Sequence, residues 1–422
     1  MNNTIKIGIL GLGTVGSGVV KSLANFPEIK IEKISVRNLE KPRSVELPDN
    51  MLTTDSNSIV NDSNIDIIVE LIGGLNPAYN LIKTALNNKK HVVTANKELI
   101  AKHGEELFEI AKQNNVVLLY EAAVAGGIPI IMPLQTALIG NKINKIQGIL
   151  NGTTNYILTK MTNENECFED VLKEAQELGY AEADPTGDVQ GYDAMYKIAI
   201  LASIAFNKRI NVENIYREGI DKITPLDISC ADELGYKIKL IAMAQNLEDE
   251  GIDVRVHPML VEKSHPIANI DYVLNAVVIE GNPVGQLTFS GAGAGEFPTA
   301  SSVVGDIISL ATEMQISEKP LWMMRCNHTE TANLTPIENT KSKFFINILT
   351  QNNPGVIGKI GVIFGQNDIS ILSLLQKGIM KDGTARIIIL TEESKEINLK
   401  KAIDELKQDQ DIKNIISVIR VN

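Results

Sequence analysis

The chain has 422 residues, of which 22% are charged and 44% hydrophobic, and its formal net charge is −12. This length predicts two or three domains of a folded globular protein. Because no Lys/Arg cluster offsets the acidic balance, nucleic acid and anionic membranes are poor partners, and no apolar run is long enough to span a bilayer. Three scattered cysteines without metal-ligand spacing, and a chain that starts directly with a strand pattern, predict a cytoplasmic protein.

The first motif is a glycine-rich turn that follows a buried-strand pattern at residues 5–10 and opens a helical pattern. In this context the first glycine permits the turn, the second lets a pyrophosphate approach the backbone, and the third lets helix and strand pack closely. The helix N-terminus then faces the phosphates. The alternative is a tight turn without a ligand. The residues expected to bind a dinucleotide are Gly11, Gly13, Thr14, Val15 and Gly16.

The second predicted strand, residues 29–37, ends in a basic residue. Folds that bind NAD usually carry Asp or Glu at this point, for the ribose hydroxyls. Here the position holds Arg37, and Lys41 and Arg43 follow. Because a guanidinium suits a 2′-phosphate, we expect NADP as the cofactor, with NAD as the alternative.

Strand and helix patterns keep alternating up to residue 130. They include a strand with a Gly turn at 65–74, a short strand at 91–94, and a strand leading into a small-residue loop at 116–130. This alternation predicts a Rossmann-type, doubly wound parallel sheet, whose ligands bind beyond the carboxyl ends of the strands. Thr94 and Lys97 should lie at that edge, although Lys97 also fits a surface lysine at a helix start.

From residue 131 the pattern changes to a mixed α+β domain that we expect to extend to residue 325. Several strands follow one another without crossover helices, which predicts an antiparallel or mixed sheet with one face free for a second chain. A glycine-rich loop containing Gly295 opens a helix at 291–314, which we expect to return to the first domain and cover the cofactor. The other predicted elements are a strand and helix over 146–161, helices over 168–179 and 234–245, and strands over 252–261 and 272–293.

A group of four carboxylates and one lysine lies between Gly179 and Lys197. Its first part reads as a loop, and an apolar helix follows. Asp193 falls in the first helical turn, where a negative charge is favoured, and Lys197 lies one turn later on the same face. A lysine at the base of an apolar helix is a candidate proton donor. The alternative is an ordinary solvated ion pair.

Residues 326–342 are polar and aperiodic and read as a linker. Residues 343–422 have the order βαββαβ, with a hairpin turn at 381–383, and this order is the ferredoxin-like plan. Where the first strand meets the first helix, backbone N–H groups are expected to hold a small anion such as an amino-acid carboxylate. The residues concerned are Asn353, Pro354 and Gly355. The alternative is a module that serves only for dimerisation.

Several blocks together resemble, in the same order, those of homoserine dehydrogenases of the longer form, and residues 343–422 resemble an ACT domain. The resemblance implies reversible reduction of L-aspartate 4-semialdehyde to L-homoserine by NAD(P)H, on the route to threonine and methionine. It also implies a dimer or tetramer with an amino-acid effector, most often threonine. The blocks lie at residues 11–19, 94–101, 121–131, 149–158, 178–197 and 291–306.

The same resemblance implies roles for single residues. Lys197 matches the proton donor, Asp193 the carboxylate beside it, and Lys97 a lysine at the cofactor and active site. Glu182 matches a substrate ligand, and Gly179 a position near substrate and nicotinamide. A structural monovalent cation, Na+ or K+, is implied at Glu121, Val124, Gly126 and Ile128. Two alternatives stay open, namely a reductase of another amino-acid semialdehyde and a non-catalytic amino-acid sensor.

Overall fold

The computed structural model describes residues 4–316, 330–379 and 383–422. The first part of the predicted linker, and Lys381 and Asp382 of the predicted hairpin turn, lie outside these residues. The chain forms two compact units. The first contains Met1–Leu150, Asp193–Asn214 and Leu274–Ala332, and the second contains Asn151–Tyr192, Ile215–Val273 and Asn333–Asn422. Among the described helices, none has the length and apolar character of a membrane span.

A six-stranded sheet forms the core of the first unit, and all its strand pairs are parallel. The strand order is β3-β2-β1-β4-β5-β6. The chain adds β2 and β3 on one side of β1 and then returns to add β4, β5 and β6 on the other side, as in a Rossmann fold. The predicted doubly wound sheet is therefore confirmed. In chain order the strands are β1 (Ile5–Leu10), β2 (Ile29–Ser35), β3 (Leu52–Thr53), β4 (Ile67–Glu70), β5 (His91–Thr94) and β6 (Leu118–Leu119).

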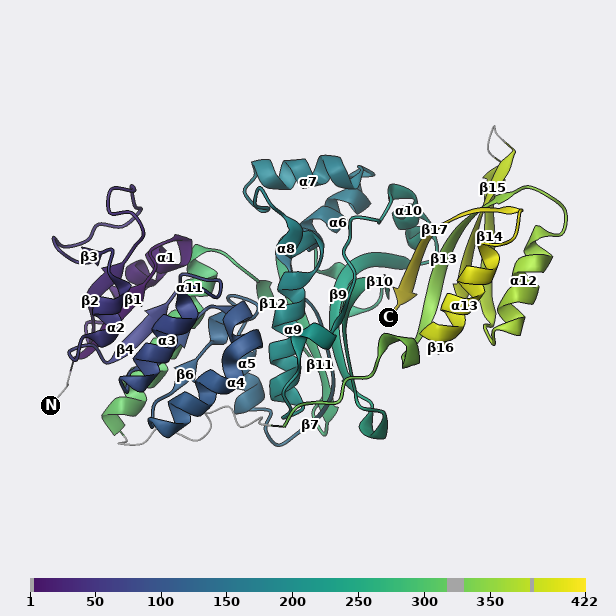
Figure 1. The fold of residues 1–422 in the computed structure, drawn as a ribbon. Coiled ribbons are helices and arrows are strands. Elements are labelled where there is room, and N and C mark those ends of the chain that lie inside the picture. The colour runs from purple at the N-terminus through teal and green to yellow at the C-terminus, as the bar shows by residue number, and fades with distance from the viewer. Residues whose placement is uncertain (1–3, 317–329, 380–382) are drawn as a thin grey trace. The chain divides into compact units, whose positions relative to one another are not determined.

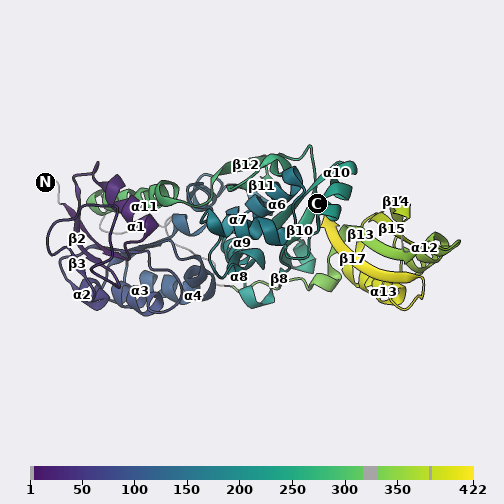
Figure 2. The same ribbon diagram turned by 90° about the horizontal axis from the view of Figure 1, so that it is seen from above.

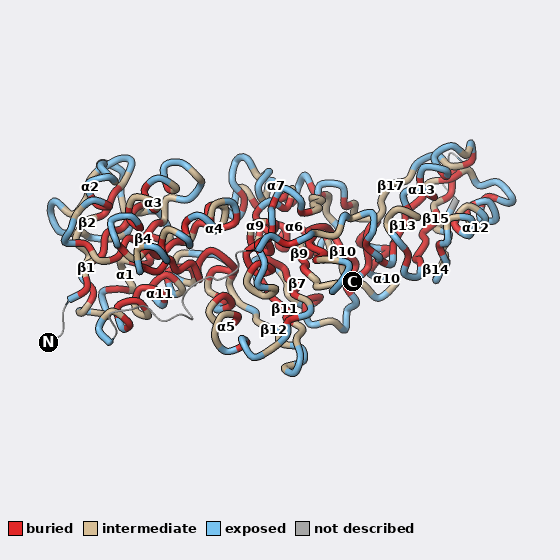
Figure 3. Tube along the Cα trace, turned by 60° about the horizontal axis from the view of Figure 1, so that its bottom comes forward, coloured by how far each residue is buried: buried red, intermediate tan, exposed pale blue. Residues whose placement is uncertain are grey.

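Helices cover both faces of this sheet (Figures 1 and 2). One face carries α1 (Thr14–Leu23) and α11 (Glu296–Ile316), and the other carries α2 (Ser56–Asn61), α3 (Ala78–Asn87) and α4 (Lys97–Gln113). Branched aliphatic side chains fill the space between, so that the strands are buried while the loops at the sheet's edge are exposed (Figure 3). The core thus includes side chains of α11, among them Ala300, Val303 and Ile307.

The segment 116–130, predicted as a strand leading into a small-residue loop, begins with a short strand in the structure. β6 ends at Leu119, and a 3₁₀ turn, Glu121–Ala123, follows it. The Glu121 carboxylate accepts hydrogen bonds from the backbone N–H groups of Ile130 and Ile131, which requires the chain to fold back on itself. An extended strand would hold these groups far apart, so the chain leaves the strand after Leu119, and the predicted change from strand to loop is confirmed.

The first unit also contains an antiparallel segment of sheet, in the order β12-β11-β7. Its strands are β7 (Lys142–Ile149), β11 (Leu274–Asn282) and β12 (Gly285–Ala292). The short α5 (Ile131–Gln135) precedes this sheet in the chain, and α9 (Tyr192–Ala205) belongs to the unit from Asp193 onward. Because α9 is apolar on nearly all sides, most of its residues are buried.

The second unit contains a mixed sheet in the order β9-β10-β17-β13-β15-β14, in which β10 and β17 run parallel and the other pairs antiparallel. The first two strands are β9 (Tyr236–Asn246) and β10 (Ile252–Glu262), and the short β8 (Tyr216–Arg217) pairs with β10. Its first four helices are α6 (Gly152–Glu164), α7 (Phe168–Glu177), α8 (Thr186–Val189) and α10 (Pro225–Glu233).

The helix predicted over 234–245 is wrong, because these residues form most of β9. The strand is buried continuously from residue 238 to 244, so it lacks the alternation of a half-exposed strand. A short apolar run that is covered on both faces reads the same as a segment of buried helix. Its antiparallel pairing with β10 over the whole length decides the outcome.

The C-terminal part has the predicted ferredoxin-like order, with strands arranged as β17-β13-β15-β14. Both helices pack on one face of these strands (Figure 1), with Phe344, Ile360, Phe364 and Leu406 in their shared core. The elements are β13 (Lys341–Gln351), α12 (Val356–Gln366), β14 (Ile371–Ile379), β15 (Thr384–Thr391), the short β16 (Ser394–Lys395), α13 (Glu396–Leu406) and β17 (Ile412–Val421).

Candidate active site

The first turns of α9 carry a buried ion pair. Asp193 and Lys197 are one helical turn apart, and Lys197 Nζ lies 2.7 Å from Asp193 Oδ2. The same Nζ donates a second hydrogen bond, of 2.7 Å, to the carbonyl of Leu150, which directly follows β7. The Asp193 and Lys197 side chains are only 8% and 10% exposed. This burial separates the pair from the solvated ion pair that the sequence left as an alternative.

A second lysine approaches the same carboxylate from another element. Lys97 is the first residue of α4, and its Nζ lies 2.7 Å from Asp193 Oδ1. Asp193 therefore bridges two ammonium groups, which leaves the cluster with a net positive charge. Lys97 is 43% exposed, so the cluster is open to solvent on that side. Such a cluster suits a substrate whose oxygen becomes negative during the reaction.

A buried carboxylate that the sequence analysis missed organises the strand ends next to Lys97. Glu70 is fully buried, and its carboxylate accepts hydrogen bonds from the N–H groups of Ile72 and Gly73 and from the Thr94 hydroxyl. The Thr94 hydroxyl oxygen in turn accepts from the N–H of Asn96 at 3.0 Å. This network fixes the carboxyl ends of β4 and β5, where ligands of such sheets bind.

The start of α4 is fixed by the same segment. Asn96 caps the helix, because its Oδ1 accepts the N–H of Leu99 at 3.1 Å. Its Nδ2 donates to the carbonyl of Gly74 at 2.6 Å. Lys97 is thus placed by the cap residue directly before it. The sequence signal for Asn96 is its position two residues after the end of β5.

The glycine-rich turn has the shape that a pyrophosphate requires. A Cβ on Gly11, which has φ +104°, would lie 2.8 Å from the carbonyl oxygen of Leu71, and one on Gly16 would lie 2.5 Å from that of Gly11. Around Gly13 nothing lies within 4 Å of the Cβ position, and no side chain caps α1 there. Thr14 and Val15 begin α1, so the open space at Gly13 lies at the N-terminus of this helix. These residues therefore fit a bound dinucleotide phosphate.

The two arginines after β2 differ in their surroundings. Arg37 lies two residues beyond the end of β2 and is exposed. Arg43 donates hydrogen bonds to the carbonyls of Asn38, Leu39 and Lys41, which ties the loop together. Arg43 is therefore a brace of the loop, whereas Arg37 presents its guanidinium to solvent at the position where a ribose phosphate is expected.

The residues with an implied cation site lie in the turn after β6. Glu121 is buried, and three backbone N–H groups, of Ile130, Ile131 and Met132, use three of the roughly four lone-pair positions of its carboxylate. Val124 and Ile128 are buried, and the Gly126 carbonyl accepts a hydrogen bond from Ser302 of α11 at 2.7 Å. Carboxylate and carbonyl oxygens are the ligands that hard cations prefer.

Asp306 of α11 is a second buried carboxyl group next to this turn, and the sequence gave no reason to expect it. Its Oδ2 accepts the N–H of Glu121 at 3.0 Å. Burial raises the pKa of Asp306 well above its usual range, and the nearby Glu121 charge adds to this rise. The hydrogen bond links α11 to the end of β6. Gly295, with φ +121°, directly precedes α11.

The remaining predicted site residues belong to the second unit. Gly179, with φ +76°, follows α7, and Glu182 is exposed, with its carbonyl accepting a 3.0 Å hydrogen bond from Gln176. The predicted effector residues are exposed before α12, and Asn353 donates a 2.8 Å hydrogen bond to Asp411. Pro354 and Gly355 complete this turn, and Gly355 is the N-cap of α12. Roles for all of these residues remain predictions.

Comparison with known proteins gives a consistent result over the whole chain. The family model described as homoserine dehydrogenase, NAD binding domain, matches residues 11–121, and the model described as homoserine dehydrogenase matches residues 129–308. A homoserine dehydrogenase of Synechocystis sp. is 47% identical, with 99% of each chain covered.

Solved structures agree with this result. The crystal structure of a homoserine dehydrogenase from Thiobacillus denitrificans superimposes with a TM-score of 0.93 at 41% identity, covering 99% of this chain and 98% of the other. A hyperthermophilic archaeal homoserine dehydrogenase in complex with NADPH has a TM-score of 0.64 at 28% identity, covering 73% of this chain and 98% of the other.

The fold and the site together define an NAD(P)-dependent oxidoreductase: a Rossmann sheet with a phosphate-binding turn, and a positively charged lysine cluster beside it in the same unit. The chain belongs to the homoserine dehydrogenase family. The resemblance inferred from the sequence blocks is confirmed, and so is the activity that it implied.

Proposed function

We propose that Lys197 is the group that exchanges a proton with the substrate oxygen in homoserine dehydrogenation. The observation that carries this proposal is the Asp193 carboxylate bridging Lys197 and Lys97 at 2.7 Å each, in a buried position at the start of α9. Reduction of an aldehyde needs a hydride at carbon and a proton at oxygen. A bound nicotinamide cofactor supplies or accepts the hydride.

In the direction of reduction, the Lys197 ammonium donates a proton to the oxygen that becomes negative, and its charge stabilises that oxygen. In the direction of oxidation, neutral Lys197 takes the proton of the homoserine hydroxyl. Asp193 and the Leu150 carbonyl hold the Lys197 Nζ in one orientation. Lys97 adds a second positive charge to the cluster and is a candidate contact of substrate and cofactor.

Substrate recognition is proposed for residues of the second unit. L-Homoserine carries an α-ammonium group, and a carboxylate is the natural partner for it. Glu182 is an exposed carboxylate in the loop after α7, and Gly179 gives that loop its left-handed turn. We assign to Glu182 the binding of the α-ammonium group and to Gly179 a position beside substrate and nicotinamide.

The proposed cofactor preference is NADP over NAD. Arg37 supports it, because it is exposed just after β2 while Arg43 is engaged with loop carbonyls. The archaeal relative solved with NADPH adds support. Gly11, Gly13, Thr14, Val15 and Gly16 would hold the pyrophosphate, with Thr94, Lys97 and Gly295 nearer the nicotinamide.

A structural Na+ or K+ ion is proposed at Glu121, Val124, Gly126 and Ile128. The chemistry of these ligands supports the proposal, because they combine one buried carboxylate with backbone carbonyls. The same turn contacts α11 through Ser302, so an ion there would stabilise the join between α11 and the end of β6. It takes no part in the proton transfer.

The C-terminal βαββαβ part is proposed to be an ACT domain that binds an amino-acid effector, most simply threonine. The exposed residues Asn353, Pro354 and Gly355, at the N-terminus of α12, support a site for the effector's carboxylate. A homodimer or homotetramer and a cytoplasmic location are likewise inferred from the family and from the sequence, and they await measurement.

The test is the absorbance change of nicotinamide reduction with L-homoserine as substrate. NADP+ and NAD+ are compared, each with and without L-threonine. Faster turnover with NADP+ and suppression by threonine are expected. Equal turnover with both cofactors would reject the proposed preference, and indifference to threonine would reject threonine as the effector.

A further inference from the structure

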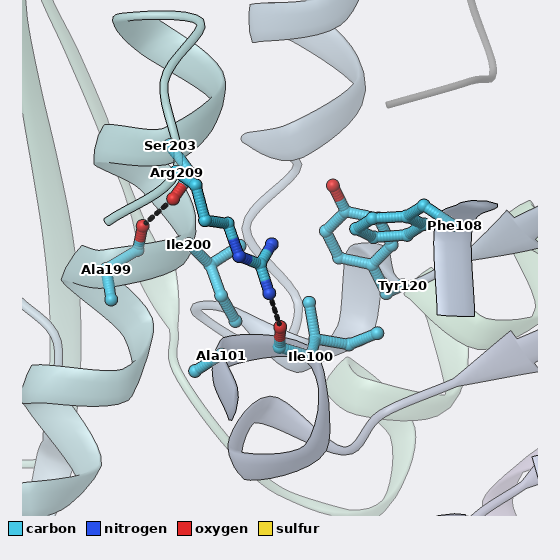
Figure 4. Close-up of a pocket in the computed structure, with 8 residues that line it drawn as sticks. All are labelled: Ile100, Ala101, Phe108, Tyr120, Ala199, Ile200, Ser203 and Arg209. Atoms are coloured by element: carbon cyan, nitrogen blue, oxygen red, sulfur yellow. Dashed lines mark hydrogen bonds between the residues drawn. The ribbon is translucent and has the colours of Figure 1, made fainter. Parts of the chain in front are cut away.

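A buried arginine lies between the two helices that carry the lysine cluster. Arg209 is 8% exposed, and its Nη2 donates a hydrogen bond of 3.1 Å to the carbonyl of Ile100. Figure 4 shows the guanidinium reaching from the segment after α9 to the first turns of α4. Ile100 follows Lys97 by three residues, so this bond holds the first turn of α4, which carries the lysine that pairs with Asp193.

The backbone around Arg209 is fixed at several points. Its N–H donates to the carbonyl of Glu330 at 2.6 Å, and its own carbonyl accepts the N–H of Ala332 at 2.8 Å. The next residue, Ile210, donates its N–H to the Ser203 hydroxyl of α9 at 3.1 Å. The guanidinium therefore extends from a backbone that is anchored to α9, and its other end meets α4.

One position of α4 leaves room for this side chain. Gly104 lies one turn after Ile100, and a Cβ on it would come within 3.0 Å of Arg209 Nη2 and 3.1 Å of Nη1. Glycine inside a helix lowers helix stability relative to alanine. Its presence at Gly104 is explained by the space that the guanidinium needs, because any side chain there would press on it.

The contact region also contains a small cavity of about 10 Å³, lined by residues of α4 and α9 and by Tyr120 and Arg209. A cavity of this size holds roughly one water molecule. Arg209 is one wall of this cavity, so a shorter side chain at this position would enlarge the space between α4 and α9.

We propose that Arg209 is a positioning residue for the reaction, which sets the separation of α4 and α9 so that Asp193 can bridge Lys97 and Lys197. The inference rests on the proposed roles of those three residues. Both ion pairs are 2.7 Å long, and a shift of about 1 Å between the helices would lengthen the Lys97 pair beyond hydrogen-bond distance and weaken catalysis.

The test compares Arg209→Met, Arg209→Lys and Gly104→Ala with the full-length protein. We expect kcat for homoserine oxidation to fall roughly tenfold to a hundredfold in Arg209→Met, with the Kd of NADP unchanged within about twofold. Arg209→Lys should recover part of the loss, because it keeps the charge. Gly104→Ala should lower kcat without lowering Tm, since alanine favours the helix while its methyl group forces the guanidinium to move by a few tenths of an ångström.

The matched control is Arg255→Met, which removes a buried arginine of the second unit that donates to Thr340 and Ser342. It should lower Tm while kcat stays near that of the wild type. The inference is overturned if folded Arg209→Met keeps kcat within about threefold of wild type, or if Arg255→Met lowers kcat equally.

Should Arg209→Met fail to fold, Gly104→Ala decides, and a normal kcat in that variant rejects the positioning role. Lys197→Ala separates this inference from the proposed function. An inactive Lys197→Ala with active Arg209 variants rejects only the role of Arg209. A fully active Lys197→Ala rejects the proposed roles on which it rests.

Discussion

The Asp193 carboxylate holds Lys97 and Lys197 at the same distance: Oδ1 lies 2.7 Å from Lys97 Nζ, and Oδ2 lies 2.7 Å from Lys197 Nζ. The two lysines come from different helices and differ strongly in exposure. Lys197 is fixed by burial and by the Leu150 carbonyl, whereas Lys97 faces solvent. One carboxylate thus organises both positive charges of the site.

Replacing this carboxylate by an amide should impair turnover more than stability. Asp193→Asn keeps the shape of the side chain but removes its charge, so neither ammonium group is held in place. We expect kcat to fall by about a hundredfold, as for loss of a group that orients an active-site charge. Steady-state kinetics and thermal unfolding measure the two effects. Glu98→Gln, which breaks the partly exposed Lys102–Glu98 pair on α4, is the control and should leave kcat unchanged.

The Glu70 carboxylate should be needed for stability and for cofactor binding. The Glu70 carboxylate accepts hydrogen bonds from the N–H groups of Ile72 and Gly73 and from the Thr94 hydroxyl. In Glu70→Gln the side-chain NH2 would face one of these donors and leave it without an acceptor. Leaving a buried donor unpaired costs roughly 1–3 kcal/mol. Denaturant unfolding should show this loss, together with a higher KM for the cofactor.

The control for Glu70 is Asp66→Asn. Asp66 directly precedes β4, at the opposite end of the strand from Glu70, and its Oδ2 also accepts a backbone N–H, that of Lys6. It should leave the cofactor KM as in the wild type. A Glu70→Gln variant as stable as wild type, with unaltered KM, would contradict the role given to this network.

The two arginines after β2 should differ in their effects on the two cofactors. Arg37→Ala is expected to weaken NADP by roughly tenfold to a hundredfold, the size of a charge-assisted hydrogen bond, and to leave NAD nearly unchanged. Arg43→Ala loosens the loop, since its guanidinium braces the Leu39 and Lys41 carbonyls, and should weaken both cofactors alike. Titration of the protein with NADPH and NADH gives the Kd values. Equal weakening by Arg37→Ala would refute the 2′-phosphate contact.

Stability should fall as the pH drops below about 6.5, because of His91. Burial lowers the pKa of His91 to about 4, and its Nδ1 accepts the N–H of Val117. Between these pH values the unfolded chain binds a proton that the folded protein does not, so acid favours unfolding. The effect is fully absent above the unfolded pKa and amounts to at most about 3 kcal/mol near pH 4.

Chemical denaturation at a series of pH values measures this dependence. His91→Gln should flatten it between pH 6.5 and 4. A substitution of His103, which forms a ring contact with Tyr79, controls for the loss of any histidine and should leave the slope in place. An unchanged slope in His91→Gln would show that other groups cause the acid sensitivity.

Local patterns in the sequence were enough to predict the phosphate-binding turn and the Asp193–Lys197 pair. Gly11 needs a positive φ and Gly16 has no room for a side chain, and both demands are visible in a short motif. Asp193 and Lys197 share a helix face by spacing alone. The order of strands and helices likewise predicted the Rossmann sheet and the ferredoxin-like part.

Contacts between segments that lie far apart in the sequence produce no local motif that could predict them. Glu70, Arg209 and Asp306 are ionisable residues whose hydrogen bonds go mostly to backbone groups of other segments, so no spacing rule reveals them. The buried strand β9 was mistaken for a helix because its burial is continuous. Both failures have one cause, which is that tertiary packing decides which apolar or charged residues become buried.

The most direct test of the account is the turnover of Lys197→Ala with L-homoserine and NADP+. Because the group that exchanges the proton is lost, kcat should fall by about a thousandfold or more, while NADPH binding and the fold are kept. Lys160→Ala, which removes a lysine paired with Glu164 and Glu174 on the second unit, should turn over as the wild type does. Near-normal turnover of Lys197→Ala would contradict the proposed mechanism.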